Sequence, residues 1–511
     1  MLKLGEPILD LALEAVVHHG YGDFFPEPTE FGIVIANWDS LRPILADFDL
    51  DTYSGYDRID TFAPKSRVNI RRVALLHPFD LLIYTALVLA LRDEITSARL
   101  PHAESRVFSY RADGAPTGVL YKDTPSYDEF KESVNARVVE HPNGFVGITD
   151  IADFYPRIYQ HRLVNALQAA AGGKKQDEIR ALEKMLYRFS EGASYGIPIG
   201  PPASRLLGEA VLIDVDSTLM SYGIDFIRFT DDFVIFAESP QKSEYGLRVL
   251  GETLFQNHGL TLQTAKTRVL PSGEYSANHL MPHTEKEEAR RKLLEIVGEY
   301  DAAVSYEDLD ESQKKEVDAL NLSEMLKEAL AEGQNVDYRE VSFILGRLSA
   351  LQKPELIPIV INNLERLYTV AHSIAAFFKP FSALDQPLRN SVEQALLGPL
   401  LNNDSAKPSE YYCIWVLSLF HDQRDWNRAQ DLLRIFRETN SDTVRRFAAL
   451  ALATSGTRSE AIQTPKYLAS ASSLCRTAIL LATGKMGADE RKYLRQGQRL
   501  NDPLEKLCAI S

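Results

Sequence analysis

The pattern of apolar residues changes near His283, and this change constrains the fold of the 511-residue chain more than any other feature. Before it, strand-like apolar runs, glycines and prolines are mixed with helical segments, which is typical of an α+β domain. From Tyr338 to the end, amphipathic segments follow one another with short breaks at Pro, Asn, Asp or Gly. The sequence therefore predicts two architectures in one chain.

The second region predicts helix pairs throughout. Six of its amphipathic segments are residues 339–351, 354–374, 390–401, 411–420, 425–439 and 442–456. Their spacing favours an irregular α-solenoid of the HEAT type, and a one-off helical bundle is the alternative. Between the two regions lies a highly charged stretch whose apolar residues also recur at helical spacing. We therefore expect domains at 1–283 and 338–511, joined by a charged helical connection at 284–337.

The composition narrows the class of protein. The chain has a formal charge of −15, and its hydrophobic and charged fractions of 45% and 25% are those of an ordinary globular protein. Disorder, a collagen-like structure and a disulfide scaffold are excluded. The acidic balance counts against a protein that coats duplex nucleic acid, because such binding depends on Lys and Arg at phosphates.

The cellular setting is also constrained by sequence. The three cysteines, Cys413, Cys475 and Cys508, have no metal-ligand spacing and are expected to be reduced thiols. The N-terminus carries acidic residues inside its apolar stretch, so it is no signal peptide. The longest apolar run, Leu81 to Leu91, is too short to span a bilayer. We expect a cytoplasmic protein that does not bind membranes.

Two segments place carboxylates at the ends of expected strands. A β-rich run from Phe145 to Thr149 leads to Asp150, which on its own would more often be a helix cap. Residues 225–239 predict a hairpin with Asp231 and Asp232 at its tip, because two apolar β-rich runs flank Thr-Asp-Asp. Acidic hairpin tips are common, but carboxylates beside a buried hairpin are costly unless a cation or donors compensate them.

Two further segments add a loop and a lysine. Residues 196–202 form a loop rich in Gly and Pro before a helix, and Ser204 is positioned to cap that helix. Gly200 in this loop would permit the close approach of a phosphate or nucleotide. Residues 259–273 contain two strand-like runs with Lys266 between them, which taken alone would be a solvated lysine.

The order and spacing of these segments resemble the palm of a reverse transcriptase. Asp150 matches the family's motif A, residues 197–204 motif B, residues 229–232 motif C and residues 260–267 motif D. Upstream, residues 65–88 and 107–111 resemble the fingers segments of the bacterial branch, so the likeness covers residues 60–275. It implies an α+β reverse-transcriptase palm and fingers, which the all-α HEAT-like helical-repeat domain expected from the later pattern would follow.

The resemblance implies two-metal nucleotidyl transfer with two Mg²⁺ ions, or Mn²⁺ in their place. Asp150 and Asp231 would be the shared metal ligands, Asp232 would support them, and the backbone carbonyl of Ile151 would be a further ligand. Lys266 would lie near the triphosphate of a dNTP and stabilise the departing pyrophosphate.

The resemblance also implies nucleotide-binding residues. Arg71 or Arg72 would hold the triphosphate from the fingers, and Gly200 lies in the nucleotide-binding loop of motif B. Tyr155 matches the aromatic position that excludes a 2′-hydroxyl, which makes the substrate a deoxynucleotide. Two departures are notable: Phe229 replaces a common Tyr, and Ile199 replaces the Gln of retroviral and group II intron enzymes, which puts ordinary templated synthesis in doubt.

The variant palm, residues 108–111 (FSYR), IPIGP in motif B and the helical C-terminal half together resemble the abortive-infection (Abi) polymerases. This is a family of AbiK-like defence reverse transcriptases, and the length is closest to that of a coliphage-prophage member. It implies antiphage, untemplated and protein-primed DNA synthesis, a single-stranded DNA product covalently attached to the protein, and a homo-oligomer, as a trimer or hexamer. The priming residue is unknown among 22 tyrosines, with Tyr21, Tyr53 and Tyr56 as candidates.

Two rival functions remain. One is a templated RNA-directed DNA polymerase of the retron or group II intron type, and the other is an inactive scaffold that binds a partner through its α-solenoid. The charge distribution bears on the first, since residues 1–284 carry −11 of the net charge of −15. This acidity argues against tight, general binding of duplexes and is compatible with a covalently held strand.

Overall fold

The computed structural model describes residues 2–279 except 23, 67, 113, 115 and 116. It further describes residues 311, 314, 315, 322–330, 336, 338–351, 354–381, 384–402, 408–423, 425–498, 500 and 502–510. The chain forms two compact units. Unit 1 consists of Met1–Asp23, Asn37–Tyr56 and Ala74–His283, and unit 2 of Phe24–Ala36, Asp57–Val73 and Thr284–Ser511. Two short segments of the first 283 residues thus belong with the C-terminal half.

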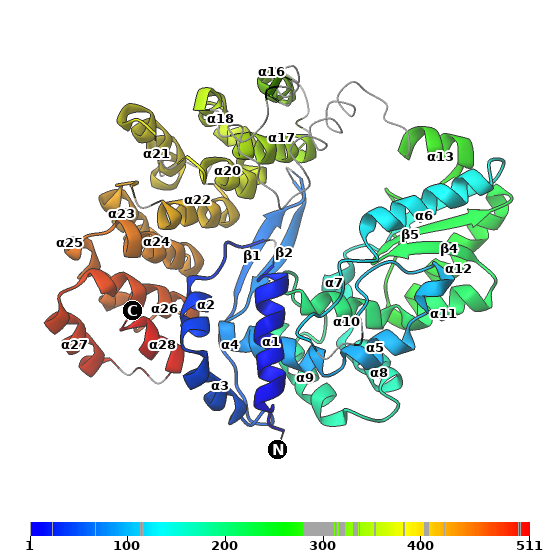
Figure 1. Ribbon diagram of the computed structural model, residues 1–511, viewed down its shortest axis with the longest axis horizontal. Helices are drawn as coiled ribbons and strands as arrows, with labels where there is room; N and C mark the ends of the chain where they lie inside the picture. Colours follow the sequence, from blue (N-terminus) through cyan, green and yellow to red (C-terminus); the bar gives the residue numbers. More distant parts are fainter. Residues whose placement is uncertain are drawn as a thin grey trace. The chain divides into compact units, whose positions relative to one another are not determined.

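A four-stranded antiparallel sheet organises unit 1 (Figure 1). Its strand order is β4-β5-β3-β6, and its strands are β3 (Phe145–Asp150), β4 (Asp225–Phe229), β5 (Asp232–Ala237) and β6 (Arg268–Pro271). The predicted strand before Asp150 and the predicted hairpin at 225–239 are confirmed. Alternating side chains of these apolar strands point to opposite faces, so both faces can be buried.

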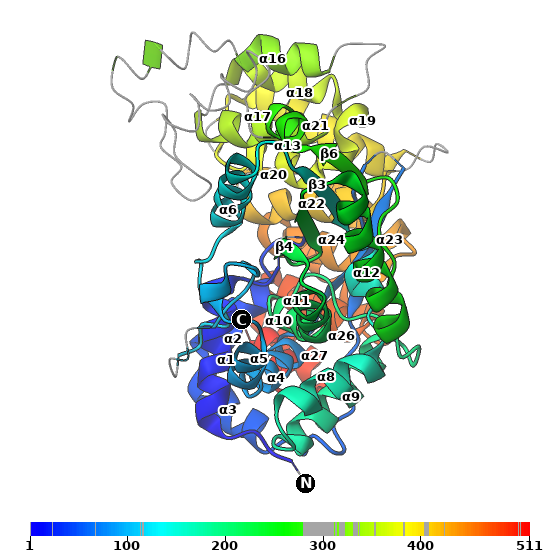
Figure 2. The same ribbon diagram turned by 90° about the vertical axis from the view of Figure 1, so that its right-hand side faces the viewer.

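Helices cover both faces of this sheet (Figure 2). The helix α12 (Pro240–His258) packs on β3, β5 and β6, and it approaches closely at Gly147, where an added Cβ would meet the Ser243 hydroxyl at 2.6 Å. The helix α6 (Tyr127–Glu140) packs on β4 and β5 and begins with a capping box at Ser126. The core beneath α6 consists of Phe108, Phe130, Val134, Val138, Val146, Ile227, Val234, Phe236 and Tyr275.

Several other helices of unit 1 pack on a buried central helix, α4 (Pro78–Leu89), which holds most of the longest apolar run. Every residue of α4 is buried, and α1, α9 and α10 pack on it. The other elements are α1 (Glu6–His19), α3 (Trp38–Ala46), α5 (Arg92–Ala98), η1 (His102–Glu104), α7 (Phe154–Arg157), α8 (Gln160–Ala170), α9 (Gln176–Phe189), α10 (Ala203–Val211), α11 (Ile213–Ser221) and α13 (Ser272–His279). Among the described residues, no helix combines the length and apolar character needed to cross a bilayer.

Unit 2 is built mainly from helices of the C-terminal half. They are α16 (Leu322–Ala329), α17 (Tyr338–Leu351), η3 (Pro354–Leu356), α18 (Ile357–Ile361), α19 (Leu364–Leu367), η4 (Tyr368–Val370), α20 (Ala371–Phe378), α21 (Gln386–Leu401), α22 (Glu410–Asp422), α23 (Ala429–Glu438), α24 (Asp442–Ser455), α25 (Arg458–Ala461), η5 (Pro465–Tyr467), α26 (Ser473–Ala482), η6 (Thr483–Lys485), α27 (Ala488–Gly497) and α28 (Pro503–Cys508). Five of the six predicted segments each correspond to one helix, whereas the segment at 354–374 is divided into η3, α18, α19, η4 and the start of α20. Most of the predicted connection at 284–337 lies outside the described residues.

Most of these helices alternate between two layers (Figure 1). In one layer α17, α20, α22, α24, α26 and α28 each contact the next, and in the other α18, α21, α23 and α25 do so. Each of these helices therefore packs on the next helix of its own layer, which is the arrangement of a helical-repeat array. The finer assignment to the HEAT type stays a prediction.

The two N-terminal segments of unit 2 are the helix α2 (Thr29–Ala36) and most of a two-stranded sheet, β1 (Ile59–Pro64) and β2 (Ile70–Leu75). Strand β1 packs on α22, and α2 packs on α28. Glu30 of α2 is fully buried and forms a bidentate ion pair with Arg446 of α24, at 2.5 and 2.7 Å. Because burying a lone carboxylate is costly, this pair fixes where α2 can pack.

Candidate active site

Strand pairing brings the predicted carboxylates together. Asp150, the last residue of β3, lies directly opposite Asp232, the first residue of β5, so their side chains share one face of the sheet. Asp231 stands at the tip of the β4–β5 hairpin, and its carbonyl accepts a hydrogen bond from the backbone N–H of Ile151 at 3.1 Å. The three carboxylates predicted from motifs A and C therefore meet at one end of the sheet.

Lys266 joins this cluster through the segment that precedes β6. The N–H of Gln263 donates to the carbonyl of Asp150 at 2.7 Å, and Lys266 follows in a turn closed on Gln263. The ammonium group of Lys266 forms an ion pair with Asp150. The structure thus places Lys266 in contact with motif A and not on a solvated face away from it.

The electrostatics of the cluster are set by burial and by like charges. Burial, together with the charges of Asp150 and Asp232, raises the pKa of Asp231 from 3.8 to about 7. Burial lowers the pKa of Lys266, but its hydrogen bond to Asp150 and the nearby carboxylates raise it overall. Asp231 is thus repelled by two neighbouring carboxylates, and a cation bound beside it would relieve this repulsion.

The carboxylates of the cluster suit Mg²⁺ if substrate phosphates and water supply the remaining ligands. Within the described part of the chain, no group of three or more His, Cys, Asp and Glu side chains is arranged to hold a metal ion by itself. Magnesium in polymerase sites is commonly held by one or two carboxylates and completed by waters and substrate phosphates. The adjacent Asp150 and Asp231 would supply those carboxylates, and Asp232 lies beside them.

Tyr155 is tied to the loop of motif B. Its carbonyl accepts from the N–H of Ile197 at 3.2 Å, and its ring lies against Gly208 of α10, where an added Cβ would come within 3.3 Å. Burial first, and then the nearby Tyr110 and Asp231, raise the pKa of its hydroxyl well above 10.0. Tyr155 therefore lies between motif B and the carboxylate cluster.

Gly200 is held in a conformation that favours glycine, with φ of 130°. The carbonyl of Ile199, just before it, accepts from the N–H of Ala74 at 2.9 Å, which fixes the loop. One sequence expectation here is wrong: Ser204 does not cap α10. Pro202 occupies the N-cap, and the hydroxyl of Ser204 is buried against that of Tyr84 at 2.9 Å.

The two arginines predicted to hold the triphosphate lie in the part of β2 that belongs to unit 2. The guanidinium of Arg72 pairs with Asp60 at 2.9 Å, and that of Arg71 lies over the ring of Phe24 at 5.5 Å. Asp60 also pairs with Arg58. Their role toward a nucleotide stays a prediction.

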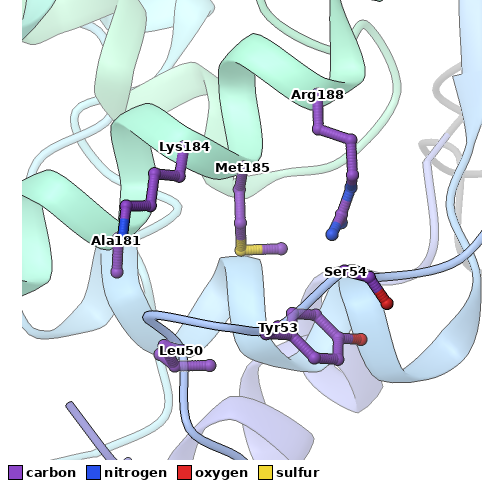
Figure 3. Close-up of a pocket in the computed structure, with 7 residues that line it drawn as sticks. All are labelled: Leu50, Tyr53, Ser54, Ala181, Lys184, Met185 and Arg188. Carbon is purple, nitrogen blue, oxygen red and sulfur yellow. The ribbon is translucent and has the colours of Figure 1, made fainter. Parts of the chain in front are cut away.

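The candidate priming tyrosines differ in environment. Tyr53 lines a cavity of about 230 Å³ between its loop and α9 (Figure 3), and its hydroxyl donates to the buried Asp80 at 2.9 Å. Burial raises the pKa of this phenol, which disfavours its use as a nucleophile. The ring of Tyr56 stacks on that of His77 at 3.8 Å. Tyr21 precedes Gly22, where any side chain would collide with the carbonyl of Gly200.

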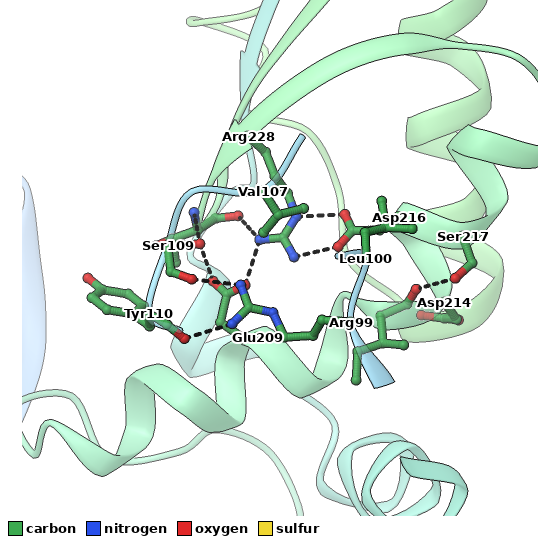
Figure 4. Close-up of polar contacts among 12 residues, drawn as sticks. Arg99, Leu100, Val107, Ser109, Tyr110, Glu209, Asp214, Asp216, Ser217 and Arg228 are labelled. Carbon is green, nitrogen blue, oxygen red and sulfur yellow. Dashed lines mark hydrogen bonds and ion pairs between the residues drawn. The ribbon is translucent and has the colours of Figure 1, made fainter. Parts of the chain in front are cut away.

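A buried charge network joins strand β4 of the hairpin to the helices α10 and α11, and it was not predicted from the sequence (Figure 4). Arg228 of β4 makes two bonds of 2.6 Å to Asp216 and one of 2.9 Å to Glu209. Glu209 also accepts from Arg99 at 2.6 Å and from the hydroxyl of Ser109 at 2.6 Å. Two sequence features could have indicated this network: an arginine inside the apolar strand DFIRF and a glutamate inside the apolar helix at 203–211.

No family model matches the chain, and no curated protein matches it. Among solved structures it is similar to telomerase from Candida albicans in complex with a fragment of telomeric RNA, at 11% identity and a TM-score of 0.32, over 76% of this chain and 71% of that one. It is also similar to apo telomerase from Candida tropicalis, at 11% identity and a TM-score of 0.35, over 83% and 74%. At this level of similarity the two structures indicate nothing about the activity of this chain.

Proposed function

We propose that the protein is a nucleotidyltransferase of the reverse-transcriptase type that polymerises dNTPs. The observation that carries this proposal is the register of β3 and β5, which sets Asp150 opposite Asp232 with Asp231 at the adjacent tip and Lys266 on Asp150. Paired carboxylates with one nearby lysine are suited to binding divalent cations and a triphosphate together.

Each residue of the cluster has a separate task in this proposal. Asp150 and Asp231 would hold the two Mg²⁺ ions, with Asp232 in support and the carbonyl of Ile151 as a further ligand. Bound Mg²⁺ supplies Lewis-acid activation of the attacking hydroxyl and charge stabilisation of the leaving phosphate. Lys266 would exchange its contact with Asp150 for the triphosphate, and Tyr155 would exclude nucleotides with a 2′-hydroxyl.

The finer proposal is untemplated, protein-primed DNA synthesis that acts in abortive infection. It is supported by the likeness of the motifs to Abi polymerases, by Ile199 in motif B and by the acidity of residues 1–284. The product would be a single strand attached to a tyrosine of the protein. We further propose a homo-oligomer, whose mass in solution would distinguish a trimer from a hexamer.

The test is to incubate the purified full-length protein with Mg²⁺ and labelled dNTPs, with and without a primed RNA template. We expect DNA synthesis without template, and a product whose mobility on a denaturing gel changes after protease treatment. Mass spectrometry of the digested product would identify the modified tyrosine. Asp231→Asn should make no product.

Two outcomes would favour the rival functions. DNA that forms only with template and primer would indicate a templated polymerase and contradict the untemplated proposal. No incorporation under any condition, together with full phage defence by Asp231→Asn in cells, would indicate a scaffold. In that case the carboxylate cluster would have no catalytic role.

A further inference from the structure

Thr230, the residue before Asp231, has an unusual backbone. Its φ is 53°, in the left-handed region, and it is 6% exposed. A β-branched side chain in this region is a conformational outlier, because the Cβ is crowded by the backbone. Such a conformation persists only where the surroundings impose it, and it occurs mainly at functional sites.

Two side chains impose this conformation from opposite sides. The hydroxyl of Ser109 accepts a hydrogen bond from the N–H of Thr230 at 3.0 Å. The guanidinium of Arg228 donates to the carbonyl of Thr230 at 3.2 Å. Both backbone polar groups of Thr230 are therefore held by buried side chains, and the direction in which Asp231 leaves the hairpin is fixed by them.

The two side chains are themselves held rigidly. Ser109 and Arg228 both bond to the carboxylate of Glu209, and Arg228 is also bound to Asp216 (Figure 4). All four side chains are buried, with exposed fractions of 1% or less. Ser109 lies on a segment that runs beside β4, joined to it by a hydrogen bond from the N–H of Phe108 to the carbonyl of Arg228.

We propose that Ser109 and Arg228 are positioning residues that hold Thr230 left-handed and so place the Asp231 carboxylate beside Asp150 for metal binding. This inference rests on the proposed function, because it assumes that Asp231 is a metal ligand. Neither positioning residue would touch the metal or the nucleotide. Their effect would pass through the backbone of Thr230 alone.

The experiment is Mn²⁺ binding to the full-length protein without nucleotide, followed by electron paramagnetic resonance of free Mn²⁺. Arg228 variants would unfold the buried network, so Ser109→Ala is the first variant. It removes the acceptor of the Thr230 N–H, and we expect Mn²⁺ to bind about tenfold more weakly, as for one lost hydrogen bond. Ser109→Ala/Thr230→Asn should recover most of the affinity, because Asn tolerates the left-handed region.

Ser243→Ala is the control for removing a buried serine, since Ser243 is fully buried in α12 against Gly147 of β3 and, among the described residues, makes no bond to the Glu209 network. It should bind Mn²⁺ like the wild type and lose less thermal stability than Ser109→Ala, because the described residues give the Ser243 hydroxyl no hydrogen-bond partner. Two results would overturn the inference: Ser109→Ala binding Mn²⁺ as well as Ser243→Ala does, or Thr230→Asn failing to rescue it. Asp231→Asn separates the two proposals, because wild-type Mn²⁺ binding by that variant would contradict the metal site itself.

Discussion

Unit 1 contains two clusters of carboxylates, and the charges of the two clusters are compensated differently. Glu209 and Asp216 are each bound by a buried guanidinium, so their charges are balanced inside the protein. Asp231 is buried beside the like charges of Asp150 and Asp232, and Asp150 pairs with the ammonium group of Lys266, whose side chain is 56% exposed. The comparison indicates that balanced carboxylates hold the structure, and under the proposed function the unbalanced ones, which repel one another, would bind cations from solution.

The largest expected effect comes from the unbalanced cluster. Asp231→Asn should lower the rate of dNTP incorporation by a factor of about 10³ or more, because a metal ligand is lost. It should also raise the free energy of unfolding by about 1 to 2 kcal/mol at pH 8, because it removes a buried like charge. Incorporation assays and urea unfolding in EDTA measure the two effects. If Asp231→Asn incorporated dNTPs at the wild-type rate, the unbalanced cluster would have no special role and the comparison would fail.

The balanced cluster should respond in the opposite way. Glu209→Gln leaves Arg99 and Arg228 buried with one carboxylate between them, and the free energy of unfolding should fall by about 3 to 5 kcal/mol. Urea unfolding measures this, with Glu252→Gln as a control at a largely exposed pair with Arg248. If Glu209→Gln were no less stable than Asp231→Asn, charge balance would not distinguish the two clusters.

Glu30 in unit 2 is another balanced carboxylate, and it should make the free energy of unfolding depend on pH. Burial raises its pKa, but Arg446 and the hydroxyl of Thr477 outweigh burial and lower it from 4.5 to about 2. An acid with a lowered pKa stabilises the fold above its unfolded pKa, so about 3 kcal/mol should be lost as the pH falls from 4.5 to 2. Urea unfolding across this range should show a steep loss in the wild type. A Glu30→Gln variant, less stable at pH 7, should show a shallower one.

The smallest effect is expected where a pair is balanced but exposed. Arg434 and Glu438 lie one turn apart on α23, with side chains 49% and 59% exposed. Because solvent screens such pairs, Glu438→Gln should change the free energy of unfolding by less than about 0.5 kcal/mol. A loss comparable to that of Glu209→Gln, measured in the same urea titration, would show that pairing matters more than burial.

The site was predictable where local pattern determines geometry. The apolar runs around Asp150 and Asp231 specify strands, and an antiparallel hairpin with a two-residue loop leaves little freedom in where its tip residues lie. The helices of residues 338–511 follow from their apolar period in the same way. The sequence also indicated Lys266, but only its spacing from the carboxylates distinguished it from a surface lysine.

The features that could not be predicted depend on contacts between residues far apart in the sequence. Ser204 has the residue type and place of a cap, yet its hydroxyl turns inward to Tyr84, which is 120 residues away in the chain. Arg228 and Glu209 are charges in apolar segments, and nothing local says that each balances the other. The placement of α2 and β1 in unit 2 likewise depends on helices far along the chain.

The burial of Glu30 against Arg446 has a consequence for the order of synthesis. The two residues are 416 positions apart, so the ribosome completes Arg446 roughly 20 to 80 seconds after Glu30. During this interval the first helix of unit 2 has no partner for its carboxylate and cannot take its final place. The folding of unit 2 is thus completed only when its last helices have been synthesised. A protein that ends at His283 would retain α2 without the helices on which it packs.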